Sequence, residues 1–449
     1  MSAAYDVLLA ATAAVGLAAM ALAYQRSRDP LHPLLLACPM ALFLYAYLPW
    51  TLEAHETLGW FVGPEDLERA QAVFLALFVA FCAGALLASG RTRWSADGPL
   101  LPLSADARRR LLTAAALVGT AGLAAWAILI VSEGGLSEVY ERPHGGDVLH
   151  PSGWVRESTR LALVGVLLTL AASQTWRSRL LALGFAAPQV VHAVLGTRRG
   201  PAFVTAFLLV GGLYIFRGRR PPVLATLAGG TAVGLLLLFL LANRQGIYYG
   251  SETPITFDLT DSIAFHPNAG NDHVVAAGLV TTAHRTGRYG WGVSYVEQMF
   301  LRPIPRELLP DKYEVLEEAT VGAEDVGATL GWRPLPGWSP TLFAHLYIEF
   351  GWLSAAASFL LGWVYGWVWR RSVESGAVGW LVLNVLFCAG LLHLIAQEFW
   401  AMAVPLLLMF VPAWAALRWA LDRPFRGPDP APCRSPSRLA AARTADAAR

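Results

Sequence analysis

The feature that most constrains the fold of this chain is a series of apolar segments, each long enough to cross a lipid bilayer as a helix. A hydrocarbon core about 30 Å thick takes about 20 apolar residues per helix. Of the 449 residues, 55% are hydrophobic and only 15% are charged, and the mean hydropathy is +0.47. A soluble domain needs more charge to cover its surface. We therefore expect a polytopic membrane protein.

The apolar segments predict an all-α fold of about eleven transmembrane helices. Runs of Arg, Pro and Gly separate them. Three segments between residues 158 and 216 are short, so a total of about ten or about twelve helices is the alternative. We place the helices near residues 4–24, 31–50, 69–90, 110–132, 158–174, 179–196, 200–216, 222–243, 340–369, 377–396 and 399–418.

The helix pattern divides the chain into four parts. Residues 1–243 are expected to form an N-terminal bundle of about eight helices, and residues 339–420 add about three more. Between them, residues 244–338 form one long loop. The tail of residues 421–449 is rich in Pro, Ala, Arg and Ser without apolar periodicity, so we expect it to be disordered. No basic segment precedes the first apolar stretch, which predicts a retained helix rather than a cleaved signal peptide.

Arginine placement predicts the orientation, because Arg and Lys near helix ends are retained on the cytoplasmic side. The loop of residues 51–68 has five carboxylates and no Lys or Arg, and the loop of residues 133–157 is mostly acidic. We expect these loops, the long loop and the N-terminus outside, and the C-terminal tail in the cytoplasm. The arginines that mark the cytoplasmic side are Arg26, Arg28, Arg91, Arg93, Arg108, Arg109, Arg110, Arg177, Arg179, Arg217, Arg219, Arg220, Arg370 and Arg371.

Composition argues against several classes of function. The net charge of +2 belongs to loops, and no segment resembles a nucleic-acid-binding module. Cys38, Cys82 and Cys388 lie in apolar segments and Cys433 lies in the polar tail, so neither a disulfide framework nor a metal-binding spacing is visible. The histidines of the long loop lack Cys partners and tight spacing. We therefore expect no nucleic acid, no metal and no cofactor.

One short turn breaks the charge rule, because two cations lie where the topology expects the outside. The turn reads Gly196-Thr-Arg198-Arg199-Gly-Pro201. In one interpretation, Arg198 and Arg199 bind lipid headgroups as ordinary interfacial arginines, or the helix count shifts there. In the other interpretation, the pair forms an anion site.

The long loop carries a stiff cluster of cations, although it is acidic overall, with seven cations against twelve carboxylates. In Arg302-Pro-Ile-Pro-Arg306-Glu-Leu-Leu-Pro-Asp-Lys312, the prolines favour an extended path. At about 3.1 Å per residue, Arg302 and Arg306 lie roughly 12 Å apart, so each is expected to contact a different group. Arginine forks suit phosphate oxygens, and Lys312 adds a point charge. The alternative is an ordinary Pro-rich lid whose cations pair with neighbouring carboxylates.

The chain then re-enters the membrane with two ionisable residues, His345 and Glu349. At positions i and i+4 they share one face of a helix. Ionisable groups in a transmembrane helix are costly and usually face a cavity or a partner. A carboxylate one turn away can fix the tautomer of an imidazole and make it a base for a hydroxyl proton. His345, or Glu349 itself, is thus a candidate general base. A neutral His345 bonded to Glu349 for packing is the alternative.

The order of these features resembles the O-antigen polymerases (Wzy-like), a family of oligosaccharide repeat-unit polymerases related to the O-antigen ligases. The motifs cover about residues 190–365. The family often has Glu two residues before the motif Tyr and Asn two residues after it, where this chain has His345 and Glu349. The matching stretches are Gly196-Thr-Arg198, Tyr289-Gly-Trp-Gly-Val-Ser-Tyr295, Ile304-Pro-Arg306 to Pro310-Asp-Lys312, and Leu342 to Gly351, of which the last two are the specific ones.

The resemblance implies a GT-C-like, metal-independent glycosyltransferase of the bacterial plasma membrane, which polymerises undecaprenyl-pyrophosphate-linked repeat units on the extracytoplasmic face. Its implied partners are the lipid-linked oligosaccharide, membrane lipids, a flippase and a chain-length regulator. Two alternatives stay open: a ligase-type transferase, which differs only in its acceptor, and a transporter of the same lipid-linked sugar. Transporters usually carry internal repeats, and none is visible here. The donor pyrophosphate would dock against Arg198, Arg199, Arg244, Arg302, Arg306 and Lys312.

Overall fold

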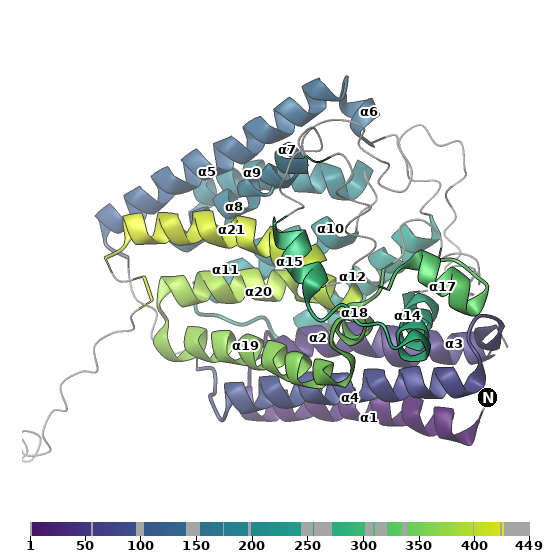
Figure 1. Ribbon diagram of the computed structural model, residues 1–449. Helices are drawn as coiled ribbons and strands as arrows, with labels where there is room; N and C mark the ends of the chain where they lie inside the picture. The colour runs from purple at the N-terminus through teal and green to yellow at the C-terminus, as the bar shows by residue number, and fades with distance from the viewer. Residues whose placement is uncertain are drawn as a thin grey trace, which may run out of the picture.

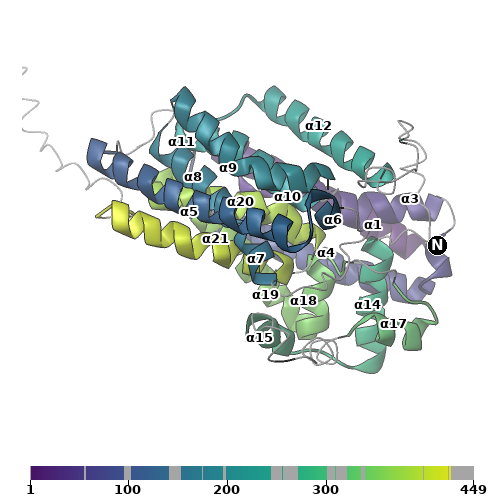
Figure 2. The ribbon, with the colours of Figure 1, turned by 90° about the horizontal axis from the view of Figure 1, so that it is seen from above.

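The part of the chain that the computed structural model describes contains helices and no strand. The described residues are 2–54, 57–95, 103–140, 153–173, 175–195, 199–243, 255, 272–300, 309, 321–334, 339–397, 399–422 and 424–425. The elements pack side by side into one bundle (Figures 1 and 2). They are α1 (Ala3–Ser27), α2 (Pro33–Leu42), the π-helical turn η1 (Phe43–Tyr47), α3 (Leu48–Ala54), the 3-10 turn η2 (Leu58–Trp60), α4 (Pro64–Ser89), α5 (Ala105–Ser132), α6 (Leu136–Tyr140), α7 (Gly153–Ser158), α8 (Leu161–Ala172), α9 (Trp176–Leu195), α10 (Arg199–Ala206), the π-helical turn η4 (Phe207–Gly211), α11 (Gly212–Phe216), α12 (Val223–Ala242), α14 (Asp272–Thr286), α15 (Val293–Phe300), α17 (Ala323–Leu330), α18 (Leu342–Phe350), the 3-10 turn η5 (Gly351–Leu353), α19 (Ser354–Ser375), α20 (Val378–Ala396) and α21 (Phe399–Ala420).

The helices confirm the expected all-α membrane protein. Within the described residues, six helices are both long enough and apolar enough to cross a bilayer. Shorter apolar helices occupy Gly200–Phe216, Val223–Leu236 and Pro405–Ala420. The larger number of crossings expected from the sequence stays a prediction. The six candidate spans are Ala3–Ser27, Pro33–Ala54, Pro64–Ser89, Ala105–Ser132, Leu342–Ser375 and Val378–Ala396.

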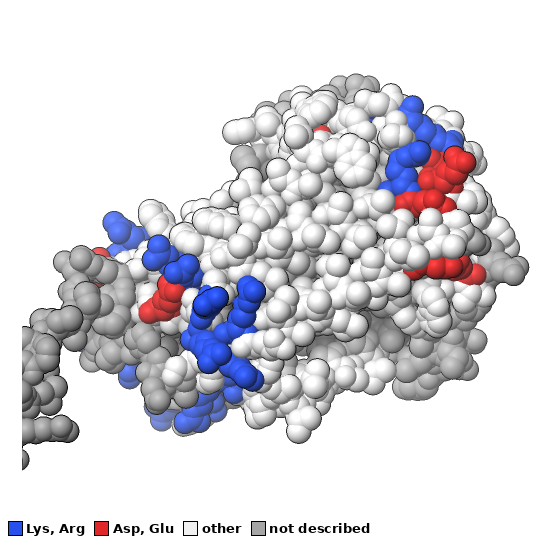
Figure 3. Space-filling model, turned by 90° about the horizontal axis from the view of Figure 1, so that it is seen from below, with Lys and Arg blue, Asp and Glu red and all other residues white. Residues whose placement is uncertain are grey.

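Charged side chains are unevenly distributed over one face of the molecule. On the face drawn in Figure 3 they gather toward the two ends of the molecule, and an uncharged zone separates them. Lys and Arg predominate at one end, whereas the other end carries both signs. Because charges are costly in hydrocarbon, the uncharged zone is the part of this face that suits the bilayer core.

Close backbone contact between α4 and α19 forms the centre of one half of the bundle. A Cβ built on Gly84 would lie 2.0 Å from the Phe359 carbonyl oxygen, and one built on Gly362 would lie 2.0 Å from the Phe81 carbonyl oxygen. The Ser358 hydroxyl donates to the Leu77 carbonyl across the same interface at 2.7 Å. Small residues let transmembrane helices approach this closely where apolar burial cannot drive their association.

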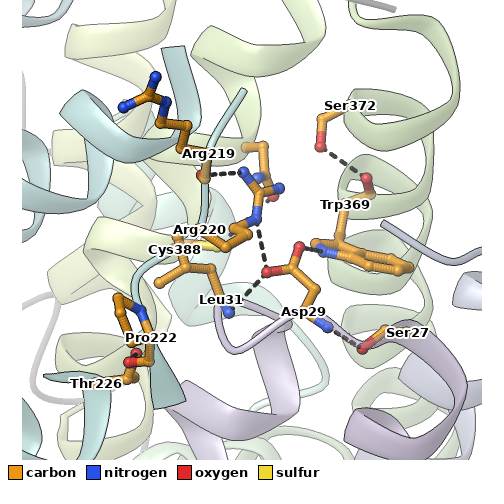
Figure 4. A network of polar contacts seen from close by, with 11 residues as sticks. Ser27, Asp29, Leu31, Arg219, Arg220, Pro222, Thr226, Trp369, Ser372 and Cys388 are labelled. Atoms are coloured by element: carbon orange, nitrogen blue, oxygen red, sulfur yellow. Dashed lines mark hydrogen bonds and ion pairs between the residues drawn. The ribbon is translucent and has the colours of Figure 1, made fainter. Parts of the chain in front are cut away.

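A buried ion pair between Asp29 and Arg220 connects helices at the Arg-rich end of the bundle (Figure 4). Asp29, in the turn between α1 and α2, is fully buried. Its carboxylate accepts hydrogen bonds from the Arg220 Nε at 2.7 Å, from the Trp369 indole N–H at 2.9 Å and from the Leu31 backbone N–H at 2.9 Å. Arg220 precedes α12 and Trp369 belongs to α19. Three segments distant in sequence therefore meet at one carboxylate, and its partners offset the cost of burying its charge.

At the opposite end, α14 and α18 lie across the bundle rather than along it (Figures 1 and 2). Residues Asp272–Thr286 of the long loop form the helix α14, in which His273 to Ala283 are buried. The helix expected over residues 340–369 is interrupted, because Gly351 adopts a φ of +54° and opens the turn η5 between α18 and α19. A left-handed φ is accessible to Gly without the steric cost that other residues pay. This break sets the direction of the helix that carries His345.

Candidate functional site

The two ionisable residues expected on one helix face lie on α18, a segment whose other residues are apolar or aromatic. His345 is 4% exposed and Glu349 is fully buried. The start of α18 is tied to the end of α20, because the Ser339 hydroxyl donates to the Ala396 carbonyl at 3.0 Å. The segment that leads into α18 is therefore bonded to α20, and α18 itself ends where Gly351 breaks the helix.

Glu349 joins α18 to the segment that leads into α15. Its carboxylate accepts hydrogen bonds from the Gly292 backbone N–H at 3.0 Å and from the Ser294 hydroxyl. Two backbone bonds support the same contact: the Gly290 N–H donates to the Ile348 carbonyl at 3.0 Å, and the Trp291 N–H donates to the Glu349 carbonyl at 2.6 Å. We call residues 290–294 and the end of α18, joined by these bonds, the Glu349 clasp. Through it, a buried carboxylate positions two distant segments of the chain.

The clasp depends on glycine at position 290. A Cβ there would lie 2.7 and 2.8 Å from the two carboxylate oxygens of Glu349, well inside ordinary contact distance. The next two residues adopt left-handed φ values, +51° at Trp291 and +81° at Gly292. Such a conformation is costly at Trp291 and persists only where the surroundings stabilise it. Gly292 takes its left-handed φ without this cost, so stabilising contacts are needed only at Trp291.

His345 contacts the residue that follows Ser294 along α15. The Tyr295 hydroxyl lies 3.2 Å from His345 Nδ1, and the two ring centroids are 5.4 Å apart. The Tyr295 ring also packs against Phe350 at 5.5 Å and against Phe399, at the start of α21, at 5.4 Å. A phenol at Nδ1 fixes the orientation of the imidazole and couples its tautomer to the hydroxyl proton.

Of the arginine turn, for which an anion site and ordinary interfacial arginines were both left open, the structure describes Arg199 to Pro201, at the start of α10. Arg199 begins α10, and a Cβ on the next residue, Gly200, would lie 2.5 Å from Nδ1 of His393 on α20. The end of α20 also receives the bond from Ser339, so the starts of α10 and α18 share one neighbouring helix. Arg198, Arg244, Arg302, Arg306, Lys312 and the side chain of Arg199 lie outside the described residues.

Three other cations of the long loop are paired with carboxylates. Arg285 binds Asp66 of α4, a residue that also pairs with Arg69 at 2.9 Å. The remaining two pairs, Arg288 with Asp325 at 2.9 Å and Arg333 with Glu324 at 2.7 Å, lie on the surface. These pairs neutralise the cations that are not part of the expected anion-binding set.

The histidines of the long loop were not expected to bind a metal. His273 is 1% exposed; its ring packs edge-on against Phe74, and burial lowers its pKa to about 3. A neutral imidazole is therefore part of the packing of α14 against α4. His284 is exposed. Within the described residues, no group of three His, Cys, Asp or Glu could hold a metal ion.

Comparison with models of protein families, with curated proteins and with solved structures finds no match to this chain. The contacts described above nevertheless join two of the stretches on which the sequence resemblance rests, Tyr289–Tyr295 and Leu342–Gly351. The motif in the first stretch did not predict a role for Gly290, Ser294 or Tyr295. The available signal was the Gly-Trp-Gly spacing, which indicates close backbone approach.

Proposed function

We propose that this protein is a membrane glycosyltransferase that polymerises undecaprenyl-pyrophosphate-linked oligosaccharide repeat units on the extracytoplasmic face. The observation that carries the proposal is the meeting of two motif stretches, in which Ser294 and Tyr295 of α15 contact Glu349 and His345 of α18. Residues that lie about 50 positions apart thus form one polar cluster at the end of the bundle. A buried polar cluster of this kind is the expected setting for acid–base chemistry.

His345 is the general base in this proposal. With Nδ1 directed at the Tyr295 hydroxyl, Nε2 takes the proton from the acceptor sugar hydroxyl. The acceptor oxygen then forms a bond to the anomeric carbon of the donor sugar, and the bond from that carbon to the pyrophosphate oxygen breaks. Glu349 acts as a positioning residue, since its carboxylate already accepts hydrogen bonds from Gly292 and Ser294.

The leaving group is the lipid pyrophosphate, on which negative charge grows as the bond breaks. Preorganised cations in a site with little water stabilise such charge better than bulk solvent does. Arginine binds phosphate oxygens through its planar fork, and lysine does so as a point charge. The residues that would supply this charge are Arg198, Arg199, Arg244, Arg302, Arg306 and Lys312.

The membrane arrangement proposed with this function has about eleven crossings in a GT-C-like bundle, with the N-terminus outside and the C-terminus in the cytoplasm. Three features support it. The Arg-rich end lies opposite α14, α15 and α18 (Figures 1 and 3). The loop with no Lys or Arg, between α3 and α4, lies at the same end as α14 and α18. The shorter apolar helices α10 to α12 and α21 lie alongside the long spans (Figure 2).

Deletion of the gene in its host tests the proposal. A polymerase deletion leaves single repeat units on the final carrier, whereas a ligase deletion leaves none there. Complementation with Arg306→Ala should fail to restore long polymer, because one phosphate contact is lost. Arg306→Lys should restore it only in part, because Lys lacks the bidentate fork. Full-length polymer from both variants would remove Arg306 from the site.

A further inference from the structure

The proposed base is enclosed in this structure. His345 is 4% exposed, and every residue of α18 from Leu342 to Glu349 is buried. A general base has to come within hydrogen-bond distance of the hydroxyl from which it takes a proton. A sugar is too large to reach an imidazole that is enclosed to this extent. For His345 to act as a base, one of the elements that cover it therefore has to move first.

Among the described elements around His345, α15 is the outermost, at the edge of the molecule beside α18 (Figure 2). Its inner side consists of Ser294, which is 5% exposed, and the half-buried Tyr295. The Tyr295 ring lies against the imidazole with centroids 5.4 Å apart, so displacement of α15 would uncover His345. Its outer side is open, with exposed fractions of 47% at Val293, 57% at Val296 and 65% at Phe300.

The Glu349 clasp attaches α15 to α18 through polar bonds. The Glu349 carboxylate accepts hydrogen bonds from the Gly292 N–H and the Ser294 hydroxyl. The N–H groups of Gly290 and Trp291 donate to backbone carbonyls of α18. Exchange of one hydrogen-bond partner for another changes the free energy little. Water and sugar hydroxyls can therefore replace the clasp bonds when α15 moves away.

Backbone strain lies at the two ends of α18. Of the three non-glycine residues with a positive φ in the described chain, Arg28 caps the end of α1, whereas Thr341 precedes α18 and Trp291 belongs to the clasp. A left-handed backbone is costly for any residue with a Cβ, and such strain is concentrated at ligand clamps and switch regions. The Trp291 side chain is 62% exposed, so the clasp bonds, rather than packing, maintain its conformation. Opening of the clasp would release this strain.

We propose that α15 is a lid over His345, which opens at the bend of residues 290–292 and admits the acceptor sugar. This structure is the closed state. The inference rests on the proposed function, since it states how the substrate reaches the base of that reaction. The clasp keeps the lid closed between turnovers, and the strain at Trp291 lowers the free energy needed to open it.

Chemical modification of His345 tests the lid without any substrate. Full-length protein in nanodiscs would be treated with diethyl pyrocarbonate, which acylates neutral imidazole, and the modified peptides would be quantified by mass spectrometry. His32, which is 1% exposed at the Arg-rich end, reports global unfolding, and the exposed His284 reports the reagent. Because local opening costs less than global unfolding, His345 should react at least about tenfold faster than His32, and more slowly than His284.

Substitution of Trp291 tests the strain. Trp291→Ala keeps a Cβ on the left-handed backbone, whereas Trp291→Gly removes that cost, and both variants lose the same ring. The Gly variant should keep the lid closed for longer, so its His345 should react roughly tenfold more slowly than that of the Ala variant, which equals about 1.4 kcal/mol. Ser294→Ala removes one clasp bond and should raise the rate. The matched pair Trp60→Ala and Trp60→Gly, at an exposed position of η2, should leave it unchanged.

Two results would overturn the proposal. Modification of His345 no faster than that of His32 would mean that α15 moves only when the whole protein unfolds. Equal or reversed rates in Trp291→Gly and Trp291→Ala would show that the bend is not a strained hinge. If the lid passes both tests but the reconstituted protein makes no polymer, the proposed function fails and the lid stands. If polymer forms while His345 stays as protected as His32, the lid fails and the function stands.

Discussion

Replacement of Glu349 tests whether its carboxylate positions two segments or acts through its charge. Glu349→Ala removes the acceptor of the Gly292 N–H and of the Ser294 hydroxyl. A buried donor left without an acceptor costs about 1–3 kcal/mol. Ser294 is 5% exposed and Gly292 is half-buried, so the two losses together should lower the free energy of unfolding by about 2–4 kcal/mol.

Glu349→Gln is the discriminating variant. Its amide oxygen can accept the Gly292 N–H, and its amide nitrogen can donate to the Ser294 hydroxyl, which rotates to accept. Only the strengthening due to charge is lost, so the expected cost is about 1 kcal/mol. Unfolding in mixed micelles with increasing SDS, followed by tryptophan fluorescence, measures both variants. A Gln variant as unstable as the Ala variant, or an Ala variant within about 0.5 kcal/mol of the wild type, would refute this account of the clasp.

Three further predictions concern packing and protonation. Gly290→Ala should cost about 1–3 kcal/mol, because its Cβ would meet the Glu349 carboxylate. Gly362→Ala should cost at least about as much, because its Cβ would meet the Phe81 carbonyl and separate α19 from α4. Burial lowers the pKa of His32 from 6.5 to about 4, against an opposing effect of Asp29. As the pH falls, His32 takes up a proton in the unfolded state before it does so in the folded state. The free energy of unfolding is therefore unaffected by His32 above pH 6.5 and decreases by about 3 kcal/mol as the pH falls toward 4. His32→Asn should remove that part of the pH dependence, since Asn keeps an acceptor for the Leu34 N–H at the start of α2.

The same SDS titration checks all three, with controls from the same chain. Gly184→Ala and Gly229→Ala introduce a Cβ that would have no neighbour within 4 Å, so both should be neutral or slightly stabilising. Equal losses in the test and control variants would show that the close contacts at Gly290 and Gly362 are not formed. For His32, an unchanged slope of the unfolding free energy between about pH 6.5 and about pH 4 in the Asn variant would contradict its assignment.

The regular helices could be predicted where long apolar runs specify them. Residues 377–396 were expected as a helix, and α20 spans Val378–Ala396. The irregular parts could not be predicted in this way. The π-helical turn after α2 depends on Gln71, 26 residues away from the Tyr45 carbonyl that it binds, and such a tertiary contact leaves no trace in hydrophobic periodicity.

The candidate site shows the same limit. Helical spacing alone places His345 and Glu349 on one face, and α18 is a helix over both residues. The helical spacing does not indicate that Ser294 and Tyr295, about 50 residues earlier, contact Glu349 and His345. That pairing depends on the left-handed bend at Trp291 and Gly292. In the sequence, Gly290 and Gly292 indicate a bend of the backbone, but not which residues the backbone approaches there.

Reconstitution tests the central claim most directly. Purified full-length protein in liposomes would receive a synthetic undecaprenyl-pyrophosphate-linked oligosaccharide, and product lengths would be resolved by gel electrophoresis and mass spectrometry. We predict a ladder of polymer with free undecaprenyl pyrophosphate as the second product. His345→Gln should slow its formation by about 10²–10⁴-fold, the usual contribution of a general base, while unfolding shows the protein still folded. No polymer from the wild type, or an unchanged rate in His345→Gln, would contradict the account.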